Sequence, residues 1–285
     1  MNNFWSRLII VLIFFPLLFI VIFLVPFFHH VIFNAIVTAA ALIGAFEVRN
    51  MFDKKGIAAY RVLAPLAALT LPAAAFLEMI ALLPAGFFLY WFTAVLGLFL
   101  VLTVLVNKEE QLGKRLPLLA SSAVIILVPA YFLTFIIRIT FLPHPQIALL
   151  YLILPVFLND IFAYLAGKLT RGWSRLNLII SPKKSLIGFM AGLAGSAATF
   201  LILSFVLPGY YEISWPAALL LGFLLGLAAI IGDLFESALK RSCGVKDSGV
   251  IMGGRGGIMD AIDSMLLSAP VFFLMFPLLA RPVFA

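Results

Sequence analysis

Residues 186–207, LIGFMAGLAGSAATFLILSFVL, form an apolar run of 22 residues that contains no Asp, Glu, Lys or Arg. A transmembrane α-helix needs about 20 consecutive, predominantly apolar residues. The apolar residues are continuous and do not alternate with polar ones, which favours a helix over a strand of a membrane barrel. The run therefore predicts a helix that spans a membrane.

The whole chain has the composition of an integral membrane protein. Of its 285 residues, 65% are hydrophobic and 11% are charged, and the mean hydropathy is +1.20. A soluble domain is typically about half apolar and about a quarter charged. We therefore expect an all-α polytopic membrane protein, a bundle of about nine transmembrane helices. The expected spans lie near residues 8–28, 31–47, 60–82, 85–106, 117–138, 146–166, 186–207, 215–239 and 258–280.

Within this bundle we expect two regions with different roles. Residues 1–115 are predicted to form an N-terminal transmembrane scaffold, and residues 116–285 a C-terminal transmembrane catalytic region. The first apolar run is too long for a signal peptide and lacks a small-residue cleavage site, so we interpret it as the first span.

The distribution of Lys and Arg predicts the orientation. These residues gather in the loops after the second, fourth, sixth and eighth expected spans, whereas the alternate loops hold little besides Pro and aromatic residues. Because cytoplasmic loops carry an excess of Lys and Arg, we expect a multi-pass protein of the cell (inner) membrane. Its N-terminus would be cytoplasmic and its C-terminus outside. The net charge of +7 then reflects topology, and we expect no nucleic-acid partner.

Ionisable residues within or beside apolar spans are costly and are therefore candidates for function. Seven acids qualify, and four of them fall between residues 233 and 263. They are Glu47, Glu78, Asp160, Asp233, Glu236, Asp260 and Asp263.

Asp233, Glu236, Ser237 and Lys240 have the spacing i, i+3, i+4, i+7 and so share one face of a helix. One interpretation is a salt bridge between Glu236 and Lys240 at the helix end. That interpretation does not account for Asp233, which lies one turn deeper in the span.

Asp260 and Asp263 share a face at the start of the last span, at the same membrane surface. Carboxylates that converge there would repel one another, and Mg²⁺, a hard cation that prefers oxygen ligands, would relieve the repulsion. We therefore predict Mg²⁺ as the cofactor, with Asp233, Glu236, Asp260 and Asp263 as its ligands. The alternative for Asp260 alone is that it stabilises the N-terminus of its helix.

The segment GGRGG, residues 253–257, precedes this helix. Glycines before a helix N-terminus can expose N–H groups to an anion, and Arg255 adds a charged donor for phosphate. A plain flexible loop is the alternative. With Lys240, Arg241 and Lys246 just upstream, the anion and the metal together suggest a nucleoside triphosphate.

A second polar cluster follows the sixth expected span. Asp160 lies within that span, and the loop after it ends in SPKKS, residues 181–185. The alternative for this loop is positive-inside topology and attraction to anionic lipid.

The segment SALKRSCGVKDSGVIMGGRGGIMDAID, residues 237–263, resembles the signature of the phosphatidate cytidylyltransferases, also called CDP-diacylglycerol synthases. Asp160 and SPKKS resemble that family too. Where the signature has a His among its glycines, this chain has Arg255. Where the signature has an Arg directly after the first Asp of its final pair, this chain has Ala261. The positions at the family spacing are Ser237, Lys240, Arg241, Lys246, Asp247, Gly254, Gly256, Gly257, Asp260 and Asp263.

The resemblance implies an Mg²⁺-dependent nucleotidyltransferase of phospholipid biosynthesis. It would join CTP to phosphatidate from the cytoplasmic leaflet, giving CDP-diacylglycerol and pyrophosphate. The expected catalytic residues are Asp233, Asp260, Asp263, Lys240 and Arg241. The expected substrate-binding residues are Asp160, Ser181, Lys183, Lys184, Ser185, Ser237, Lys246, Asp247, Gly254, Arg255, Gly256 and Gly257.

Three other functions stay open at this point. A related CTP-dependent polyprenol or phytol kinase, or an archaeol cytidylyltransferase, would share the basic loops and carboxylates. An ion-coupled transporter would also carry intramembrane acids, but near the bilayer midplane. The changes at Arg255 and Ala261 would suit an inactive scaffold. The sequence leaves open whether the protein is a monomer or a homodimer.

Overall fold

The computed structural model describes residues 16–105, 112–170, 173–252 and 256–284, and nearly all of its regular structure is helical. Two short strands, β1 (Tyr211–Glu212) and β2 (Arg281–Pro282), pair antiparallel. The helices are η1 (Ile20–Leu24), α2 (Phe27–Lys55), α3 (Leu63–Met79), α4 (Phe87–Val104), α5 (Leu112–Ile126), η3 (Leu127–Tyr131), α6 (Thr134–Ile139), α7 (Pro145–Leu169), α8 (Leu186–Val206), α9 (Trp215–Ser242) and α10 (Met259–Leu279).

Among the described residues, seven helical segments are long and apolar enough to cross a membrane, and α3 is a shorter apolar helix. The seven are α2, α4, α7, α8, α9, α10 and the continuous stretch Leu112–Ile139 formed by α5, η3 and α6. This confirms an all-α polytopic membrane protein. The first expected span, 8–28, begins outside the described residues.

The chain packs as two compact units. Unit 1 comprises residues 1–141 and 242–261, and unit 2 comprises residues 142–241 and 262–285. The segment between α9 and α10 therefore packs with the N-terminal helices, although it follows the last of them, α6, by about a hundred residues. The expected division at residue 115 separates a scaffold from a catalytic region by function and not by packing, so it stays a prediction.

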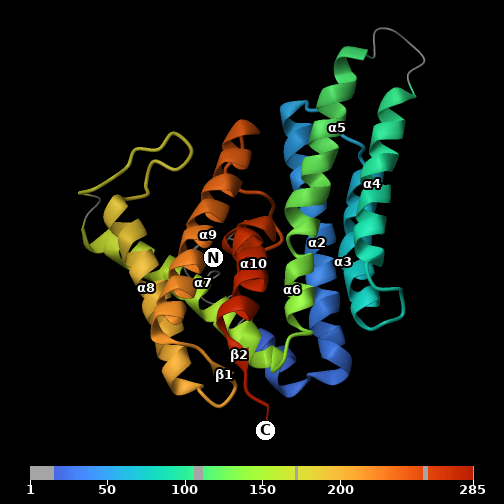
Figure 1. Cartoon of the computed structure of the whole chain (residues 1–285). Helices are drawn as coiled ribbons and strands as arrows, with labels where there is room; N and C mark the ends of the chain where they lie inside the picture. Colours follow the sequence, from blue (N-terminus) through green and yellow to red (C-terminus); the bar gives the residue numbers. More distant parts are fainter. Residues whose placement is uncertain (1–15, 106–111, 171–172, 253–255, 285) are drawn as a thin grey trace. The chain divides into compact units, whose positions relative to one another are not determined.

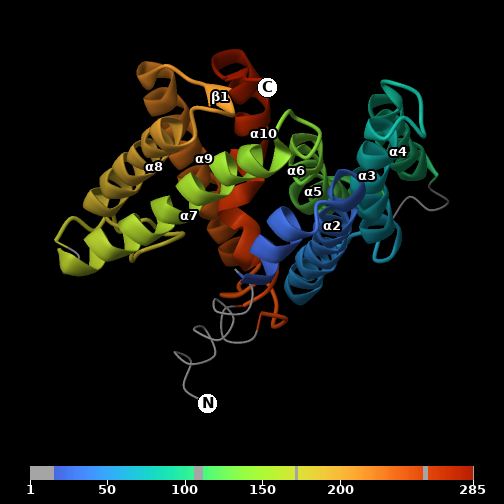
Figure 2. The same cartoon turned by 90° about the horizontal axis from the view of Figure 1, so that it is seen from below.

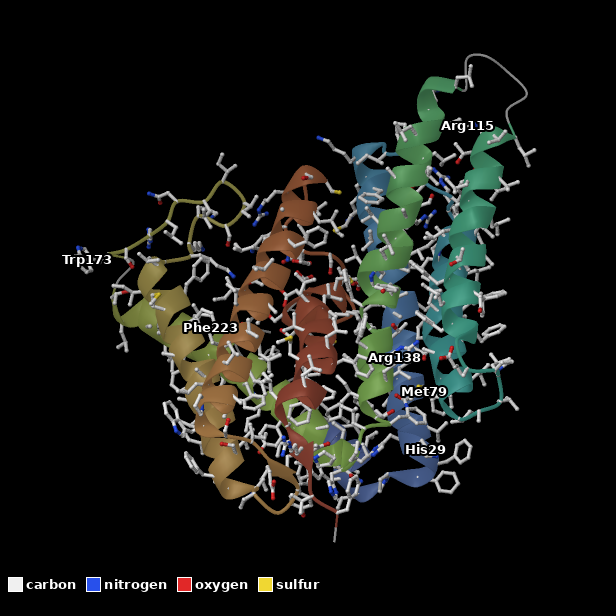
Figure 3. All side chains as sticks on the ribbon, in the orientation of Figure 1. His29, Met79, Arg115, Arg138, Trp173 and Phe223 are labelled. Carbon is white, nitrogen blue, oxygen red and sulfur yellow. The ribbon has the colours of Figure 1, made fainter. Side chains whose placement is uncertain are left out.

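In unit 1, helices α2, α3, α4 and α5 run side by side (Figures 1 and 2). Arg115 lies at one end of this unit and His29 at the other (Figure 3). The first turn of α2 is distorted, and Asn34 Nδ2 donates to the His29 carbonyl at 2.9 Å and to Thr140 Oγ1 at 3.0 Å. The buried Asn34 amide is thus paired within this unit.

Glu78, one of the seven acids near the spans, has a structural partner in unit 1. Its Oε2 accepts a hydrogen bond at 2.5 Å from the Phe88 N–H, in the first turn of α4. The first N–H groups of a helix have no partner within the helix, and a negative charge there is also favoured by the helix dipole. Glu78 of α3 therefore caps a neighbouring helix.

In unit 2, glycines allow the helices to approach closely. A Cβ atom at Gly195 of α8 would lie 2.2 Å from the Phe162 ring of α7. One at Gly222 of α9 would lie 2.6 Å from Ala197 Cα of α8, and one at Gly232 would lie 2.5 Å from the Asp263 carbonyl oxygen of α10. Small residues at helix contacts let backbones pack tightly where lipid removes the hydrophobic drive for association. Within unit 2, α7 thus packs closely on α8, α8 on α9, and α9 on α10.

We predict that Gly222→Ala destabilises the protein by about 1–3 kcal/mol, because the new methyl group would meet backbone atoms of α8, which cannot rotate away. The matched control is Gly97→Ala in α4, where a Cβ would meet nothing within 4 Å. Thermal unfolding in detergent should show a lower Tm for Gly222→Ala and an unchanged or slightly higher Tm for Gly97→Ala. Equal Tm values for the two variants would contradict the packing argument.

Candidate active site

A group of carboxylates converges on one hydroxyl in unit 2. Ser264 Oγ lies 3.0 Å from Asp160 Oδ2 of α7 and 3.1 Å from Asp263 Oδ1 of α10. The Ser264 N–H also donates to Asp263 Oδ1 at 2.6 Å. A hydroxyl carries one proton, so it can donate to only one of these carboxylates at a time. The two carboxylates therefore compete for one hydroxyl proton, and their oxygens are the kind of ligand that a hard cation prefers.

Lys184 brings a positive charge to the same part of unit 2. It lies just before α8 and forms an ion pair with Asp233 of α9. Burial lowers the pKa of Lys184, and the nearby carboxylates of Asp160 and Asp263 oppose this by raising it. The structure thus brings together four of the residues predicted from sequence, from four separate segments of the chain.

The other residues of the SPKKS segment differ in their surroundings. Ser185 is buried, and its Oγ accepts the Gly188 N–H at 3.1 Å, so it is the N-cap of α8. Lys183 is exposed and Ser181 is half-buried. Backbone bonds hold the segment against residues 174–178, including Leu176 N–H to the Lys184 carbonyl at 3.0 Å. The sequence-predicted contact of Ser185 with a substrate stays a prediction, because this side chain is buried at the helix end.

Glu236 and Lys240 form an ion pair inside α9, as the salt-bridge interpretation predicts. The Glu236 side chain is fully buried and that of Lys240 is 11% exposed. Ser237 is half-buried and Arg241 is exposed. A role for Glu236 as a metal ligand stays a prediction, and it would require this pair to rearrange.

Asp260 lies in unit 1, at the start of α10. Its Oδ2 accepts hydrogen bonds from Gly257 N–H at 2.8 Å, Ser248 N–H at 2.8 Å and Ser248 Oγ at 2.7 Å. This is the helix-stabilising geometry of the alternative interpretation. Gly256 has a positive φ of 103°, and a Cβ there would lie 2.3 Å from Asp260 Oδ2. Gly256 is thus required by the local fold, independently of any ligand.

A cavity of about 730 Å³ opens beside this segment in unit 1. Its wall includes the predicted residues Lys246 and Asp247, together with Asn50 and Lys54 near the end of α2. Lys246 and Asp247 are exposed, so both can reach a ligand from solution. Gly254 and Arg255 lie outside the described residues.

The donor set of unit 2 fits the predicted cation in part. Among the described residues, no three side chains of His, Cys, Asp or Glu come together as a metal centre. Asp160 and Asp263 nevertheless offer two carboxylates that share one hydroxyl. Mg²⁺ is often bound by one or two carboxylates, with water and phosphate oxygens completing its shell. A site that gains its remaining ligands from a substrate triphosphate is consistent with this arrangement.

Sequence reasoning did not assign three polar residues that the structure places at these sites. Ser264 links Asp160 to Asp263, and Ser248 links Asp260 to Glu47. For Glu47 the sequence offers one signal, which is the free-energy cost of an acid in an apolar span. Its partners lie more than 200 residues away, so no local pattern could have identified them.

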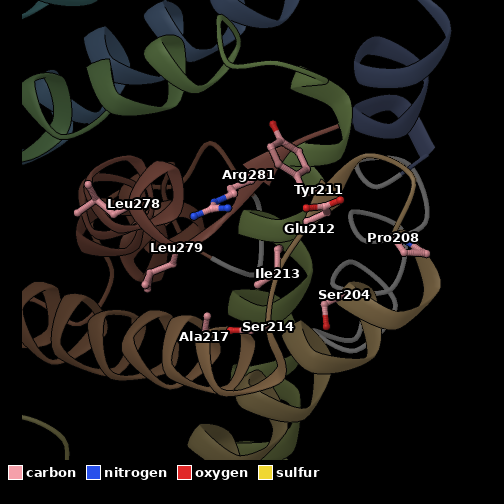
Figure 4. A pocket seen from close by; sticks show the side chains of 10 residues that line it. All are labelled: Ser204, Pro208, Tyr211, Glu212, Ile213, Ser214, Ala217, Leu278, Leu279 and Arg281. Carbon is pink, nitrogen blue, oxygen red and sulfur yellow. The ribbon is translucent and has the colours of Figure 1, made fainter. Parts of the chain in front are cut away.

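A second cavity, of about 610 Å³, lies in unit 2 beside β1 and β2 (Figure 4). Glu212, Arg281, Ser204 and Ser214 contribute its polar lining. None of the residues predicted to bind substrate or metal lines this cavity. The predicted chemistry of unit 2 thus gathers around Asp160, Lys184 and Asp263 and not at the strand pair.

We predict that Lys240→Met destabilises the protein by about 3–5 kcal/mol, because it leaves the fully buried Glu236 carboxylate without its cation. The double variant Glu236→Gln/Lys240→Met should recover much of this loss, since both charges are then removed. Chemical denaturation of the single and double variants measures the difference. Additive losses in the double variant would show that the pair is not coupled.

The comparisons with known proteins agree on a family. A sequence model of the cytidylyltransferase family matches residues 5–279. The uncharacterized protein YnbB of Escherichia coli is 42% identical over 116 residues, 40% of this chain and 37% of the relative. The phosphatidate cytidylyltransferase of Synechocystis is 42% identical over 132 residues, 45% of this chain and 42% of the relative. That of Aquifex aeolicus is 35% identical over 161 residues, 54% of this chain and 55% of the relative.

These alignments cover from 37% to 55% of the relatives' own lengths, so the chain matches about half or less of each. The family model, by contrast, covers nearly the whole chain. The chain therefore belongs to the cytidylyltransferase family, a family of nucleotidyltransferases, as its signature segment predicts.

Proposed function

We propose that this protein is a phosphatidate cytidylyltransferase of phospholipid biosynthesis. A phosphate oxygen of phosphatidate would attack the α-phosphorus of CTP, and the bond from that phosphorus to the β-phosphate oxygen would break. The products are CDP-diacylglycerol and pyrophosphate. The observation that carries this proposal is the convergence of Asp160, Lys184, Asp233 and Asp263 in unit 2. Of these, Asp160, Lys184 and Asp263 also lie in segments that resemble the family.

The reaction suits the side chains of this cluster. Phosphatidate is already an anionic nucleophile, so the step needs charge neutralisation and in-line positioning more than a strong base. Lys184 would hold a phosphate oxygen, for which it would exchange its present partner Asp233. Lys240, Arg241, Lys246 and Arg255 are proposed to stabilise the other phosphates, and Ser181, Lys183 and Ser185 to contact the nucleotide or the lipid headgroup.

We propose Mg²⁺ as the cofactor. When bound, it would neutralise the triphosphate and polarise the phosphorus that is attacked. Asp160 and Asp263 are the ligands that the described contacts support, and the sequence pattern adds Asp233, Glu236 and Asp260. Ser264 would hold Asp160 and Asp263 in place, since its side chain contacts both and its backbone N–H also donates to Asp263.

The proposed setting follows from the apolar helices and the basic loops. Phosphatidate would enter from the cytoplasmic leaflet of the inner membrane, with its acyl chains among the helices and its headgroup at the basic residues. The N-terminus would be cytoplasmic and the C-terminus outside. CTP would reach the site from the cytoplasm.

The purified protein, given CTP, phosphatidate and Mg²⁺, should release pyrophosphate and form CDP-diacylglycerol. Replacing Asp263 by Asn should lower kcat at least about 100-fold, because it removes a charge that positions the cation and substrate. Asp53→Asn is the matched control, since Asp53 forms ion pairs only with Arg49 at 3.0 Å and Arg61 at 3.5 Å in unit 1. It should keep wild-type kcat.

The products distinguish this function from its nearest alternative. A CTP-dependent lipid kinase would transfer the γ-phosphate and release CDP, with no pyrophosphate. Release of CDP, or no turnover of CTP by the wild-type protein, would reject the cytidylyltransferase proposal. An unchanged rate in Asp263→Asn would reject the assignment of Asp263 alone.

A further inference from the structure

Glu47 of α2 is a buried acid that the proposed mechanism does not use. The residue is 4% exposed, and it contributes to the wall of the 730 Å³ cavity of unit 1. Glu47 Oε1 accepts the Ile258 N–H at 3.0 Å, and Oε2 accepts the Met259 N–H at 3.0 Å. Ser248 Oγ lies 3.2 Å from Oε2 as well. Both carboxylate oxygens thus bind the segment that joins α9 to α10.

These bonds satisfy donors that the helix itself cannot satisfy. Ile258 directly precedes α10 and Met259 is its first residue, so their N–H groups have no acceptor within the helix. The carboxylate charge also interacts favourably with the positive end of the helix dipole. Glu47 therefore caps α10 from a helix that precedes it by about two hundred residues in the chain.

The glycines around this segment leave room for the Glu47 carboxylate. A Cβ at Gly249 would lie 2.3 Å from Glu47 Oε1. A Cβ at Gly257 would lie 2.4 Å from both Glu47 oxygens and 2.4 Å from Ser248 Oγ. Any side chain at either position would displace the carboxylate, so the backbone is shaped around Glu47.

Ser248 connects Glu47 to the signature residue Asp260. Its hydroxyl lies 3.2 Å from Glu47 Oε2 and 2.7 Å from Asp260 Oδ2, and its N–H donates to Asp260 at 2.8 Å. Asp260 in turn accepts the Gly257 N–H. Movement of Glu47 would therefore be transmitted to Asp260 and to the first turn of α10.

We propose that Glu47 is a positioning residue for the nucleotidyl transfer. It fixes residues 248–249 and 256–258 and the first turn of α10, and so holds Asp260, Gly256 and Gly257 in their working arrangement. The kinetic part of this inference rests on the proposed function, whereas the structural part does not. It gives a role to α2, which lies in the part of the chain that the sequence pattern treats as scaffold.

Glu78 provides a matched control. It is also an acid in an apolar helix of unit 1, and it also caps a neighbouring helix, through the Phe88 N–H of α4. Helix α4 carries no signature residue. Glu47→Gln and Glu78→Gln therefore remove the same charge from the same kind of contact, and of the two only Glu47 contacts Ser248, Ile258 and Met259 among the described residues.

The first measurement needs no activity. Cys243 is the only cysteine of the chain, it is 4% exposed, and it lies in unit 1 just before the segment that Glu47 holds. Burial raises the pKa of its thiol and the nearby Lys55 lowers it, so burial limits the thiolate available to a maleimide. Glu47→Gln should speed maleimide labelling of Cys243 about tenfold, because an amide nitrogen cannot accept the hydrogen bond that one carboxylate oxygen accepted. Glu78→Gln should label at the wild-type rate.

The second measurement uses the transferase reaction. Glu47→Gln should raise the Mg²⁺ concentration for half-maximal rate and lower kcat about tenfold or more, with a smaller change in the KM for CTP. Glu78→Gln should leave all three values unchanged in the fraction of protein that is folded. If Glu47→Gln does not fold, Gly257→Ala disturbs the same carboxylate from the other side and should give the same accelerated labelling.

The outcomes separate the inference from the proposed function. Wild-type labelling of Cys243 in Glu47→Gln, or equal acceleration in Glu78→Gln, would overturn the positioning role. Accelerated labelling with unchanged kinetics in an active enzyme would overturn its link to catalysis. A wild-type protein without transferase activity would reject the proposed function, while the labelling result would still decide whether Glu47 holds the segment.

Discussion

An ionised carboxylate among apolar helices is stable only if donors or cations surround it, and this constraint organises the molecule. Glu47 and Glu78 receive N–H groups from the first turns of helices to which they do not belong. Glu236 is fully buried and paired with Lys240 one turn later. In these three cases the described partners of the carboxylate are helix N–H groups, a serine hydroxyl or one lysine. Each of these contacts also holds two parts of the fold together.

Asp160, Asp233 and Asp263 are arranged differently. Three carboxylates from three helices share one lysine and one serine hydroxyl in unit 2. The charge of Lys240 also acts on Asp263, so acids and bases from several helices meet here. Carboxylate oxygens that converge from different helices are the ligands that a hard cation prefers, and this convergence separates the group from the acids that hold a single helix end. Close helix contacts at Gly195, Gly222 and Gly232 make the convergence possible, because they hold α7, α9 and α10 near enough for the charges to meet.

Much of the fold could be predicted from the sequence, because the signal is local. An apolar run such as 186–207 implies a spanning helix without reference to any other part of the chain, and α8 begins and ends within one residue of it. The i, i+4 pair of Glu236 and Lys240 is local too. The ion pair of Lys184 with Asp233 and the link from Ser264 to Asp160 join distant segments, and residue spacing contains no information about them. Glu47 shows this limit most clearly. The sequence indicates that an acid in an apolar helix costs free energy, but it does not identify partners that lie more than 200 residues away.

The glycines of the signature illustrate why a motif can combine two requirements. From sequence, glycines before a helix suggest a backbone that approaches a phosphate. In the structure, Gly257 leaves room for Glu47 and its N–H is held by Asp260, while Gly256 adopts a positive φ beside the same carboxylate. These positions would need glycine even without a ligand, because a side chain would displace an acid that caps α10. A phosphate contact, if the segment makes one, is therefore built on a backbone whose shape is already determined by Glu47 and Asp260.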